Sequence, residues 1–388
     1  MGLLWLFLFH PSVAWNSRGT LLYSSKSDNV GSVEAMYTSA DITETMRIES
    51  VAEMKNVNSV LNSVSPLESN LPLLLQSNNE VLDYLDDNAI QNYLFDCDGV
   101  LYRGTDPMPS ASQAIQQLIK KDKQVFFVTN NAASTRAELK SKLEKVLRCE
   151  GVLKEEMMIG SAYVAGQYLK PRLLKQNGEK ARVHVIGTSG LCSELQSAGF
   201  DISGGQDPID TPSGMSRDEL AAYTFPEGKI DALVIGLDND FNYRKLCIAT
   251  VLLQRNPDAL LVATNMDAFD LVGYDSRHLP GNGALVSAVE MASGRRAINI
   301  GKPSSTLSEL MMDVYGLKPE ETMMIGDRLD TDIKFGNENK MHSALVLTGC
   351  TTSSDIQSLL NDDTTSQTMI PSVIFPHVGL MCDADVDD

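Results

Sequence analysis

Cysteine is sparse and scattered in this sequence. Its six cysteines form no CxxC pair, and none has a histidine partner at metal-binding spacing. We therefore expect neither a disulfide framework nor a zinc site, and a mature protein that works in a reducing compartment. A free cysteine beside a strand, such as Cys97, is usually a small buried residue. Redox regulation through this thiol is the alternative.

Basic residues are also in short supply. The 388-residue chain has 32 lysines and arginines against 51 acids, a formal net charge of -19. This balance argues against a nucleic-acid-binding surface, which needs clustered positive charge. A phosphate-bearing substrate would have to meet local positive charge in its pocket. A metal ion with one or two lysines would supply it.

Long hydrophobic runs are missing as well. The N-terminal apolar run, Gly2–Phe9, is far too short to span a bilayer, and we find no transmembrane segment or internal repeat. With 43% hydrophobic residues, the chain has enough apolar material for a well-buried core. Its length allows about two globular domains.

The N-terminus has the composition of a targeting segment. Gly2–Phe9 is typical of a signal-peptide apolar region, although a basic start is missing, and Ser12–Ala14 offers a small-residue cleavage site before Trp15. Residues 15–27 contain hydroxyls, two basic residues and no acid, as in transit peptides. This order resembles the bipartite presequences of algae with complex plastids. It implies a plastid location; an untargeted, cytoplasmic protein with a disordered extension is the alternative.

The chemistry of the chain centres on residues 92–102, NYLFDCDGVLY. The short apolar run Tyr93–Phe95 predicts a buried central strand of a parallel sheet, and such strands present functional groups at their carboxyl ends. Asp96 and Asp98 would leave the strand end on the same side. Two neighbouring carboxylates imply either a shared proton or a bound cation. An ordinary Asp-Gly turn is the alternative.

Strands and helices alternate along the rest of the chain, which predicts a doubly wound α/β fold with a mainly parallel sheet. A second alternating pattern interrupts it and predicts an inserted domain. The expected helices are 110–121, 135–147 and 303–315, the last with Pro303 in its first turn. The expected organisation is a presequence and disordered linker (1–77), a core (78–171), an inserted domain (172–296), the returning core (297–376) and an acidic tail (377–388).

Two further edges of these elements carry groups suited to phosphate. At Thr129-Asn130-Asn131 a hydroxyl and consecutive backbone N–H groups can bind phosphate oxygens. A plain turn with Asx hydrogen bonding is the alternative. Lys302, where a strand meets a helix, is a point charge for a phosphate and for an attacking carboxylate, with a surface lysine as the alternative.

The segment 326–332, GDRLDTD, again ends an apolar strand in Gly-Asp. Asp332 follows Asp327 at a spacing that can bring it back over a loop. Asp96, Asp327 and a backbone carbonyl are hard oxygen ligands, which suit an octahedral Mg²⁺ that keeps several waters. Solvated loop acids are the alternative.

The four motifs DCDGV, TNN, GKPS and GDRLDTD, in this order, resemble those of the haloacid dehalogenase superfamily of phosphotransferases. The insertion resembles the C2 cap domain of the nitrophenylphosphatase-like branch. Similarity runs from about residue 88 to about residue 376. Within the branch, FDCDGVLYRG, VFFVTNNA, ATNMDA and MMIGDRLDTDI are similar to the motifs of phosphoglycolate phosphatases.

This resemblance implies a division of labour among the aspartates. Asp96 would be the nucleophile that becomes an aspartyl phosphate, and Asp98 the general acid and base. Mg²⁺ would be held by Asp96, the carbonyl of Asp98 and Asp327, with Asp332 orienting these ligands.

The resemblance also assigns the transferring phosphoryl group to four residues: Thr129, Asn130, Asn131 and Lys302. Positioning and charge neutralisation would supply most of the catalysis. In this branch the enzymes often dimerise through the cap, so a homodimer is expected.

Substrate specificity is expected in the cap, within residues 265–284, where Arg277 or His278 would meet a substrate carboxylate. Related pyridoxal phosphatases carry a histidine where this chain has Phe269-Asp270. The first hypothesis is hydrolysis of 2-phosphoglycolate in a photorespiratory plastid. The alternatives are a phosphatase for pyridoxal phosphate, glycerol phosphate, a broad range of esters or phosphoproteins. A phosphate-binding scaffold is the non-enzyme alternative.

Overall fold

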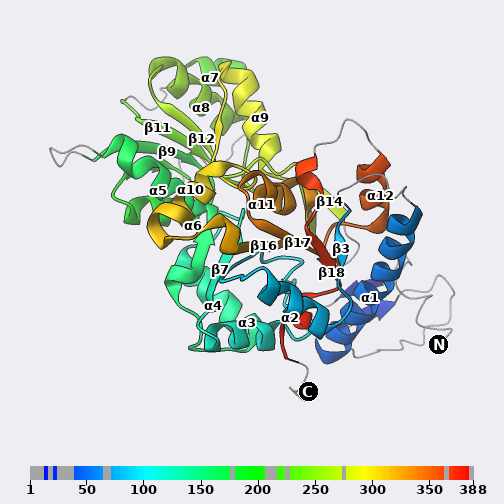
Figure 1. Cartoon of the computed structure of the whole chain (residues 1–388). Helices are drawn as coiled ribbons and strands as arrows, with labels where there is room; N and C mark the ends of the chain where they lie inside the picture. Colours follow the sequence, from blue (N-terminus) through cyan, green and yellow to red (C-terminus); the bar gives the residue numbers. More distant parts are fainter. Residues whose placement is uncertain are drawn as a thin grey trace, which may run out of the picture.

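Two parallel β-sheets organise the protein. The computed structural model describes residues 13–15, 21–23, 39–63, 71–174, 180–205, 216–222, 228–272, 277–361 and 367–383. Figure 1 shows the larger sheet in the centre of the molecule and the smaller one to its upper left. The doubly wound α/β architecture predicted from the alternation of elements is confirmed.

The larger sheet, which we call the core sheet, has seven strands in the order β3-β18-β17-β16-β4-β7-β8, and neighbouring strands are parallel. Its strands are β3 (Leu73–Leu74), β4 (Asn92–Phe95), β7 (Gln124–Thr129), β8 (Met158–Gly160), β16 (Thr322–Gly326), β17 (His342–Val346) and β18 (Val373–Phe375).

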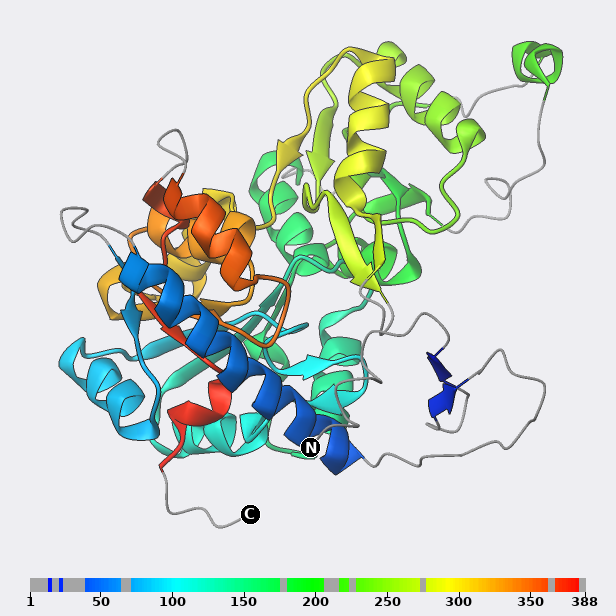
Figure 2. The same cartoon turned by 90° about the vertical axis from the view of Figure 1, so that its right-hand side faces the viewer.

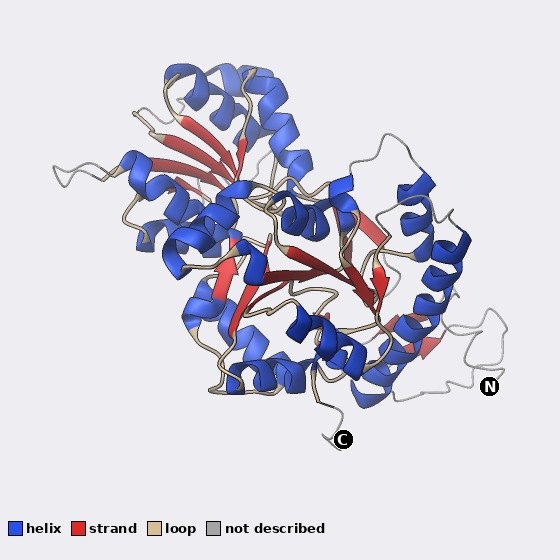
Figure 3. Ribbon diagram, viewed as in Figure 1, coloured by secondary structure: helices blue, strands red, loops and turns tan. Residues whose placement is uncertain are grey.

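Helices cover both faces of the core sheet (Figure 3). They are α2 (Asn78–Asp87), α3 (Ala111–Lys120), α4 (Arg136–Leu147), α5 (Ser161–Leu173), α10 (Ser305–Tyr315), α11 (Lys334–Glu338) and α12 (Ser353–Asn361). Side chains of β4 alternate between the two faces, because Tyr93 and Phe95 join one apolar cluster and Leu94 the other. None of the described helices is long and apolar enough to cross a membrane.

The inserted domain, or cap, is built on a five-stranded parallel sheet in the order β10-β9-β11-β12-β15. These strands are β9 (Arg182–Ile186), β10 (Asp201–Gly204), β11 (Ala232–Ile235), β12 (Leu260–Ala263) and β15 (Ile298–Asn299). The cap helices are α6 (Ser189–Ser197), α7 (Arg217–Ala222), α8 (Tyr243–Arg255) and α9 (Asn282–Ser293). The hairpin β13–β14 (Phe269–Val272, Arg277–Pro280) also belongs to this insertion (Figure 2).

The cap extends beyond the expected boundary at residue 296. Residues 297–300 were expected to return the chain to the core, but β15 pairs with β12, Ile298 opposite Val262. The strand-forming residues were identified correctly, whereas the sheet that accepts them depends on tertiary pairing that no local pattern encodes.

The segment expected to be a disordered linker is partly folded. Residues 39–63 form α1 (Ser39–Ser63), a 25-residue helix that lies along the core beside α12 (Figure 2). Its residues Met54, Val57 and Leu61, at helical spacing, are buried in a cluster with core residues. β3 then adds an edge strand next to β18. Residues 1–12, 16–20, 24–38 and 64–70 of the expected presequence and linker lie outside the described residues. The strands β1 (Val13–Trp15) and β2 (Leu21–Tyr23) pair antiparallel.

The expected acidic tail is also folded at its start. The 3₁₀ helix η7 (Val378–Met381) places Val378, Met381 and Cys382 in the main apolar cluster. Asn78 Nδ2 donates a hydrogen bond to the carbonyl of Cys382 at 2.8 Å. The apolar residues before the acidic run therefore seal the core, and residues 384–388 lie outside the described part of the chain.

Local capping accounts for several helix starts. Thr135 and Glu138 form a capping box at the start of α4, where the periodicity predicted a helix. For α10 the outcome differs: the helix begins at Ser305 with Ser304 as its N-cap, so Pro303 precedes the first turn instead of lying in it. The Ser304 hydroxyl accepts the Thr306 N–H, a bond that the proline pattern alone did not reveal.

Candidate active site

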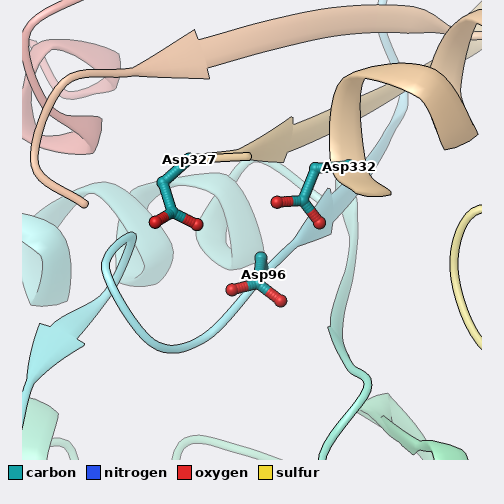
Figure 4. A group of neighbouring side chains, drawn as sticks. All are labelled: Asp96, Asp327 and Asp332. Carbon is teal, nitrogen blue, oxygen red and sulfur yellow. The ribbon is translucent and has the colours of Figure 1, made fainter. Parts of the chain in front are cut away.

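Three neighbouring strands of the core sheet end at one edge. The register aligns Phe95 of β4 with Ile325 of β16 and Phe127 of β7. Asp96 follows β4, and Asp327 follows β16. Asp332 returns to the same place from the turn η5 (Leu329–Ile333), so that the three carboxylates face one another (Figure 4).

A cavity of about 420 Å³ lies above this edge, between the core and the cap. All the residues that the motifs singled out for chemistry line it: Asp96, Asp98, Thr129, Asn130, Asn131, Lys302, Asp327 and Asp332. Arg277 and His278 do not line it. They lie on the exposed strand β14, where the His278 ring stacks on Phe269 with centroids 4.1 Å apart.

Lys302 is the buried cation of the site. Its side chain is only 2% exposed, so the surface-lysine alternative does not hold. Its Nζ lies 2.6 Å from Asp96 Oδ1 and 2.7 Å from Asp332 Oδ1, and donates to the carbonyl of Val128 at 2.9 Å. Burial alone would lower the pKa of Lys302, but Asp332 and Asp96 outweigh it and raise that pKa, so the ammonium stays charged.

Asp327 is held at the end of β16 with its carboxylate facing the cluster. The backbone N–H of Cys350 donates to Asp327 Oδ2 at 2.7 Å. Two glycines leave room for this carboxylate: a Cβ atom on Gly99 would lie 2.6 Å from Oδ2, and one on Gly349 closer still. Gly99 also has a positive φ of 80°, which favours glycine in the Asp-Gly turn. Glycine at both positions therefore leaves space for this carboxylate.

The charges of the cluster call for a further cation. Burial raises the pKa of Asp96 well above its usual range, against the pull of Lys302. Burial, with the charge of Asp332 next, raises the pKa of Asp327 to about 6. Ligand oxygens of Asp96, Asp327 and Asp332 all lie within 4.8 Å of one another. Three carboxylates and one ammonium group leave an excess negative charge that a divalent cation fits, and carboxylate oxygens are ligands that Mg²⁺ prefers. Asp332 was expected only to orient the metal ligands, but its carboxylate is itself part of the three-carboxylate cluster.

Asp98 is separate from the three-carboxylate cluster. It is exposed at the cavity wall, and its Oδ2 accepts a hydrogen bond from the Tyr102 hydroxyl at 3.0 Å. The two aspartates that are adjacent in sequence therefore have different surroundings. Cys97 between them is fully buried, and burial raises the pKa of its thiol, so its position offers nothing for thiolate chemistry.

The asparagine side chains of the TNN turn already have hydrogen-bond partners within the protein. Asn130 Nδ2 donates to Asp267 in the cap at 2.9 Å, and its Oδ1 accepts the Lys302 N–H at 2.9 Å. Asn131 Oδ1 accepts the Ala133 N–H at 2.7 Å, as in an Asx turn. Asn130, expected to hold the phosphoryl group, thus uses its side chain to fix Lys302 and the cap.

Sequence reasoning did not assign four charged residues that line the cavity: Arg103, Asp267, Asp270 and Arg328. Arg103 belongs to FDCDGVLYRG and Asp267 to ATNMDA, so both lie in quoted motifs, but the local pattern gives neither residue a role. Burial raises the pKa of Asp267 and of Asp270, while Arg328 opposes this rise for both. The Arg328 guanidinium lies 5.0 Å from the centre of the Phe269 ring, which ties the core loop to the cap.

A parallel core with an aspartate nucleophile candidate, a buried lysine and a carboxylate cluster under a cap defines a class of phosphate-transferring hydrolases. Residues 93–201 match the family model of haloacid dehalogenase-like hydrolases, and residues 299–373 match a second HAD hydrolase-like model. The chain belongs to the haloacid dehalogenase-like hydrolases, in the C2-capped branch.

Curated relatives place it among the phosphatases of this branch. It is 37% identical over 270 residues to chronophin of Bos taurus, which covers 70% of this chain and 85% of that protein. It is 39% identical over 280 residues to glycerol-3-phosphate phosphatase of Rattus norvegicus (71% and 84% covered). It is 34% identical over 271 residues to phosphoglycolate phosphatase 2 of Arabidopsis thaliana (69% and 86%).

Solved structures agree with this placement. NagD from E. coli matches with a TM-score of 0.58 and 25% identity, covering 77% of this chain and 98% of that one. Glycerol phosphate phosphatase Rv1692 from Mycobacterium tuberculosis, in complex with magnesium, matches with a TM-score of 0.59 and 26% identity, covering 76% and 78%.

Proposed function

We propose that this phosphatase hydrolyses a small phosphate monoester through covalent attack by Asp96, with Mg²⁺ at the three-carboxylate cluster and 2-phosphoglycolate as the substrate. The observation that carries the proposal is the contact of Lys302 with both Asp96 and Asp332 beside Asp327. Lys302 favours the ionised form of the Asp96 carboxylate at the strand end, where it faces the cavity as a nucleophile requires.

The residues divide the reaction between them. An Asp96 carboxylate oxygen forms a bond to phosphorus, and the bond to the ester oxygen breaks with its electron pair remaining on that oxygen. Asp98 protonates the departing oxygen and, as a carboxylate, then takes a proton from the water that hydrolyses the aspartyl phosphate. Lys302 balances the charge of Asp96, and a bound Mg²⁺ would neutralise charge on the phosphoryl oxygens.

The direct test is an Asp96→Asn variant. Phosphate release from nitrophenyl phosphate should require Mg²⁺ in the unmodified protein and be abolished in the variant, while circular dichroism shows an intact fold. An active Asp96→Asn protein would refute the mechanism. A protein that binds phosphate but releases none from any ester would instead support the scaffold alternative.

The substrate assignment rests on Arg103. This residue lines the cavity and donates from Nη2 to the Thr348 carbonyl at 2.6 Å. Among the described residues its ion-pair partner is Glu49, at 3.8 Å and exposed. Exposed pairs of this kind contribute little, so a substrate carboxylate can replace Glu49. Arg328 is less available, because it already donates to both carboxylate oxygens of Asp330.

A second candidate substrate, glycerol phosphate, is favoured by a different observation. The cap contributes Asp267 and Asp270 to the cavity wall, and acceptor carboxylates suit the hydroxyls of a polyol better than another carboxylate. Specificity constants for 2-phosphoglycolate, glycerol phosphate, pyridoxal phosphate and phosphotyrosine peptides decide between them. Arg103→Gln should selectively impair 2-phosphoglycolate, and Asp270→Asn should selectively impair glycerol phosphate; a preference for any ester other than 2-phosphoglycolate refutes the first assignment.

Location and assembly form part of the same proposal. A photorespiratory role requires import into a plastid, and mass spectrometry of the natural N-terminus should then find the presequence removed. Tyr243 on α8 and Met291 on α9 of the cap are 62% and 87% exposed. These adjoining helices are the expected contact between two copies, and light scattering should give the mass of a homodimer.

A further inference from the structure

The side chain of Asp98 is the end of a hydrogen-bonded chain that starts on another element. Lys142, on α4, donates from Nζ to the Tyr102 hydroxyl at 2.8 Å. The Tyr102 hydroxyl in turn donates to Asp98 Oδ2 at 3.0 Å. Because the lysine can only donate, it fixes the direction of the second bond: the phenolic proton points at Asp98.

The tyrosine is rigid. Its side chain is 1% exposed, and burial raises the pKa of its hydroxyl, which therefore stays protonated as a donor. The Tyr102 carbonyl accepts the N–H of Gly99 at 2.9 Å, which closes the loop between Asp98 and β5 (Tyr102–Arg103). Lys142 Nζ also lies 4.2 Å from the centre of the Tyr102 ring. The ring is thus held by packing on one side and by a cation at its tip.

No other hydrogen bond to the Asp98 carboxylate is found in the part of the chain that the structure describes. With Oδ2 bound by Tyr102, Oδ1 is the oxygen left for the substrate. We infer that Tyr102, braced by Lys142, is a positioning residue that holds the Asp98 carboxyl so that Oδ1 faces the ester oxygen leaving phosphorus. This inference rests on the proposed role of Asp98.

The bond changes define what this positioning affects. The P–O bond to the leaving group breaks, its electron pair stays on the ester oxygen, and that oxygen takes the proton from Asp98 Oδ1. Tyr102 and Lys142 keep their own protons throughout. An alkoxide leaving group is strongly basic and needs this proton, whereas nitrophenolate leaves without it. Loss of the tyrosine hydroxyl should therefore matter more for alkyl esters.

The experiment compares Tyr102→Phe with the unmodified enzyme on an alkyl phosphate and on nitrophenyl phosphate, using kcat/KM. This quantity excludes the later hydrolysis of the aspartyl phosphate, in which Asp98 acts as a base for every substrate. We expect kcat/KM to fall about 10-fold more for the alkyl ester than for nitrophenyl phosphate, as the loss of one oriented hydrogen bond predicts. The loss should appear in kcat more than in KM.

Controls separate positioning from packing. Tyr93→Phe removes a hydroxyl from another buried core tyrosine, which donates to the carbonyl of Ile90. It should leave unchanged the ratio of kcat/KM for the alkyl ester to kcat/KM for nitrophenyl phosphate. Lys142→Met, at an exposed position, should change the preference between the two esters in the same direction as Tyr102→Phe. Lys145→Met on the same helix should not.

The outcomes are distinguishable. If the unmodified enzyme hydrolyses neither ester, the proposed function fails. If it hydrolyses both and Tyr102→Phe lowers kcat/KM equally for both, or for neither, the positioning role is overturned while the proposed function stands. Thermal unfolding of each variant identifies a fold defect, and in that case Lys142→Met alone decides.

Discussion

Asn130 of the core donates a hydrogen bond from Nδ2 to the Asp267 carboxylate of the cap, 2.9 Å from Oδ1. Its backbone carbonyl accepts a further bond from Asn265 of the cap at 2.8 Å. The residue that also fixes the backbone of Lys302 is therefore the residue that meets the cap. The contact between core and cap and the placement of the buried lysine are therefore coupled through one side chain.

Replacing Asn130 should disturb the contact with the cap and the position of Lys302 at the same time. We expect Asn130→Ala to lower kcat/KM by about 100-fold, because small displacements of catalytic groups cost about that factor. Steady-state kinetics on nitrophenyl phosphate measure it. The comparison is Asn131→Ala, which removes an exposed turn contact but keeps the backbone N–H groups expected to bind phosphate, and should cost far less. Equal effects of the two changes would contradict the coupling.

Lys302 should be needed for stability as well as for activity. Lys302→Met leaves Asp96 and Asp332 buried without their cation, and breaking a buried ion pair in this way costs about 3–5 kcal/mol. Chemical unfolding without metal measures the loss. Part of it should be recovered with saturating Mg²⁺, since the metal supplies the missing positive charge.

A second buried lysine provides the comparison. Lys245 pairs with Asp238 in the cap at 2.6 Å, and neither residue belongs to the three-carboxylate cluster. Lys245→Met should destabilise the protein without any recovery by Mg²⁺. If Mg²⁺ stabilised both variants equally, the cluster would not be the metal site.

Gly349 tests the metal site without removing a carboxylate. A Cβ atom there would meet the Asp327 carboxylate at far less than van der Waals distance, so Gly349→Ala must displace it. We expect the affinity for Mg²⁺ to fall at least about 10-fold, comparable to losses when the support of a metal ligand is removed. Calorimetric titration measures it. Gly160→Ala, whose Cβ would make only ordinary contacts at 3.6 Å, should bind Mg²⁺ normally.

The strand ends of the core could be predicted because their signal is local. Short apolar runs that stop at Asp96, Thr129 and Asp327 encode buried parallel strands, and topology then brings their ends together. The catalytic cavity also includes Gly349 and Asp270, which only the folded chain brings there. In the sequence, a glycine after a strand, such as Gly349, predicts only a turn. Its closeness to Asp327 depends on how the neighbouring strand β17 is placed in the sheet.

Helix α1 was missed for a physical reason. Its apolar residues Met54, Val57 and Leu61 are separated by polar residues on a long, mostly exposed helix, so the composition resembles that of a linker. The cluster that buries them is supplied by residues far along the chain, including Ile333 and Leu345. Tertiary packing, not propensity, stabilises such a helix.

The contribution of α1 can be measured. Met54 is 3% exposed, and Met54→Ala should destabilise the protein by about 2–5 kcal/mol through lost burial and a cavity. Ile48, 53% exposed on the same helix, is the control, and Ile48→Ala should change stability little. Urea unfolding of the two variants decides. Equal stabilities would mean that the helix is not part of the folded core.

His377 should make stability depend on pH. It is 6% exposed, and burial lowers its pKa from the ordinary 6.5 to about 4. The unfolded chain therefore takes up this proton first as the pH falls, and stability is lost from about pH 6.5 down to about pH 4. Between pH 7.5 and pH 5 this single group accounts for a loss of about 2 kcal/mol. Urea unfolding at both pH values measures the total drop in the free energy of unfolding. In His377→Gln this drop should be smaller by about 2 kcal/mol. The exposed His278→Gln should retain the full pH dependence, and the same slope in all three proteins would contradict the assignment.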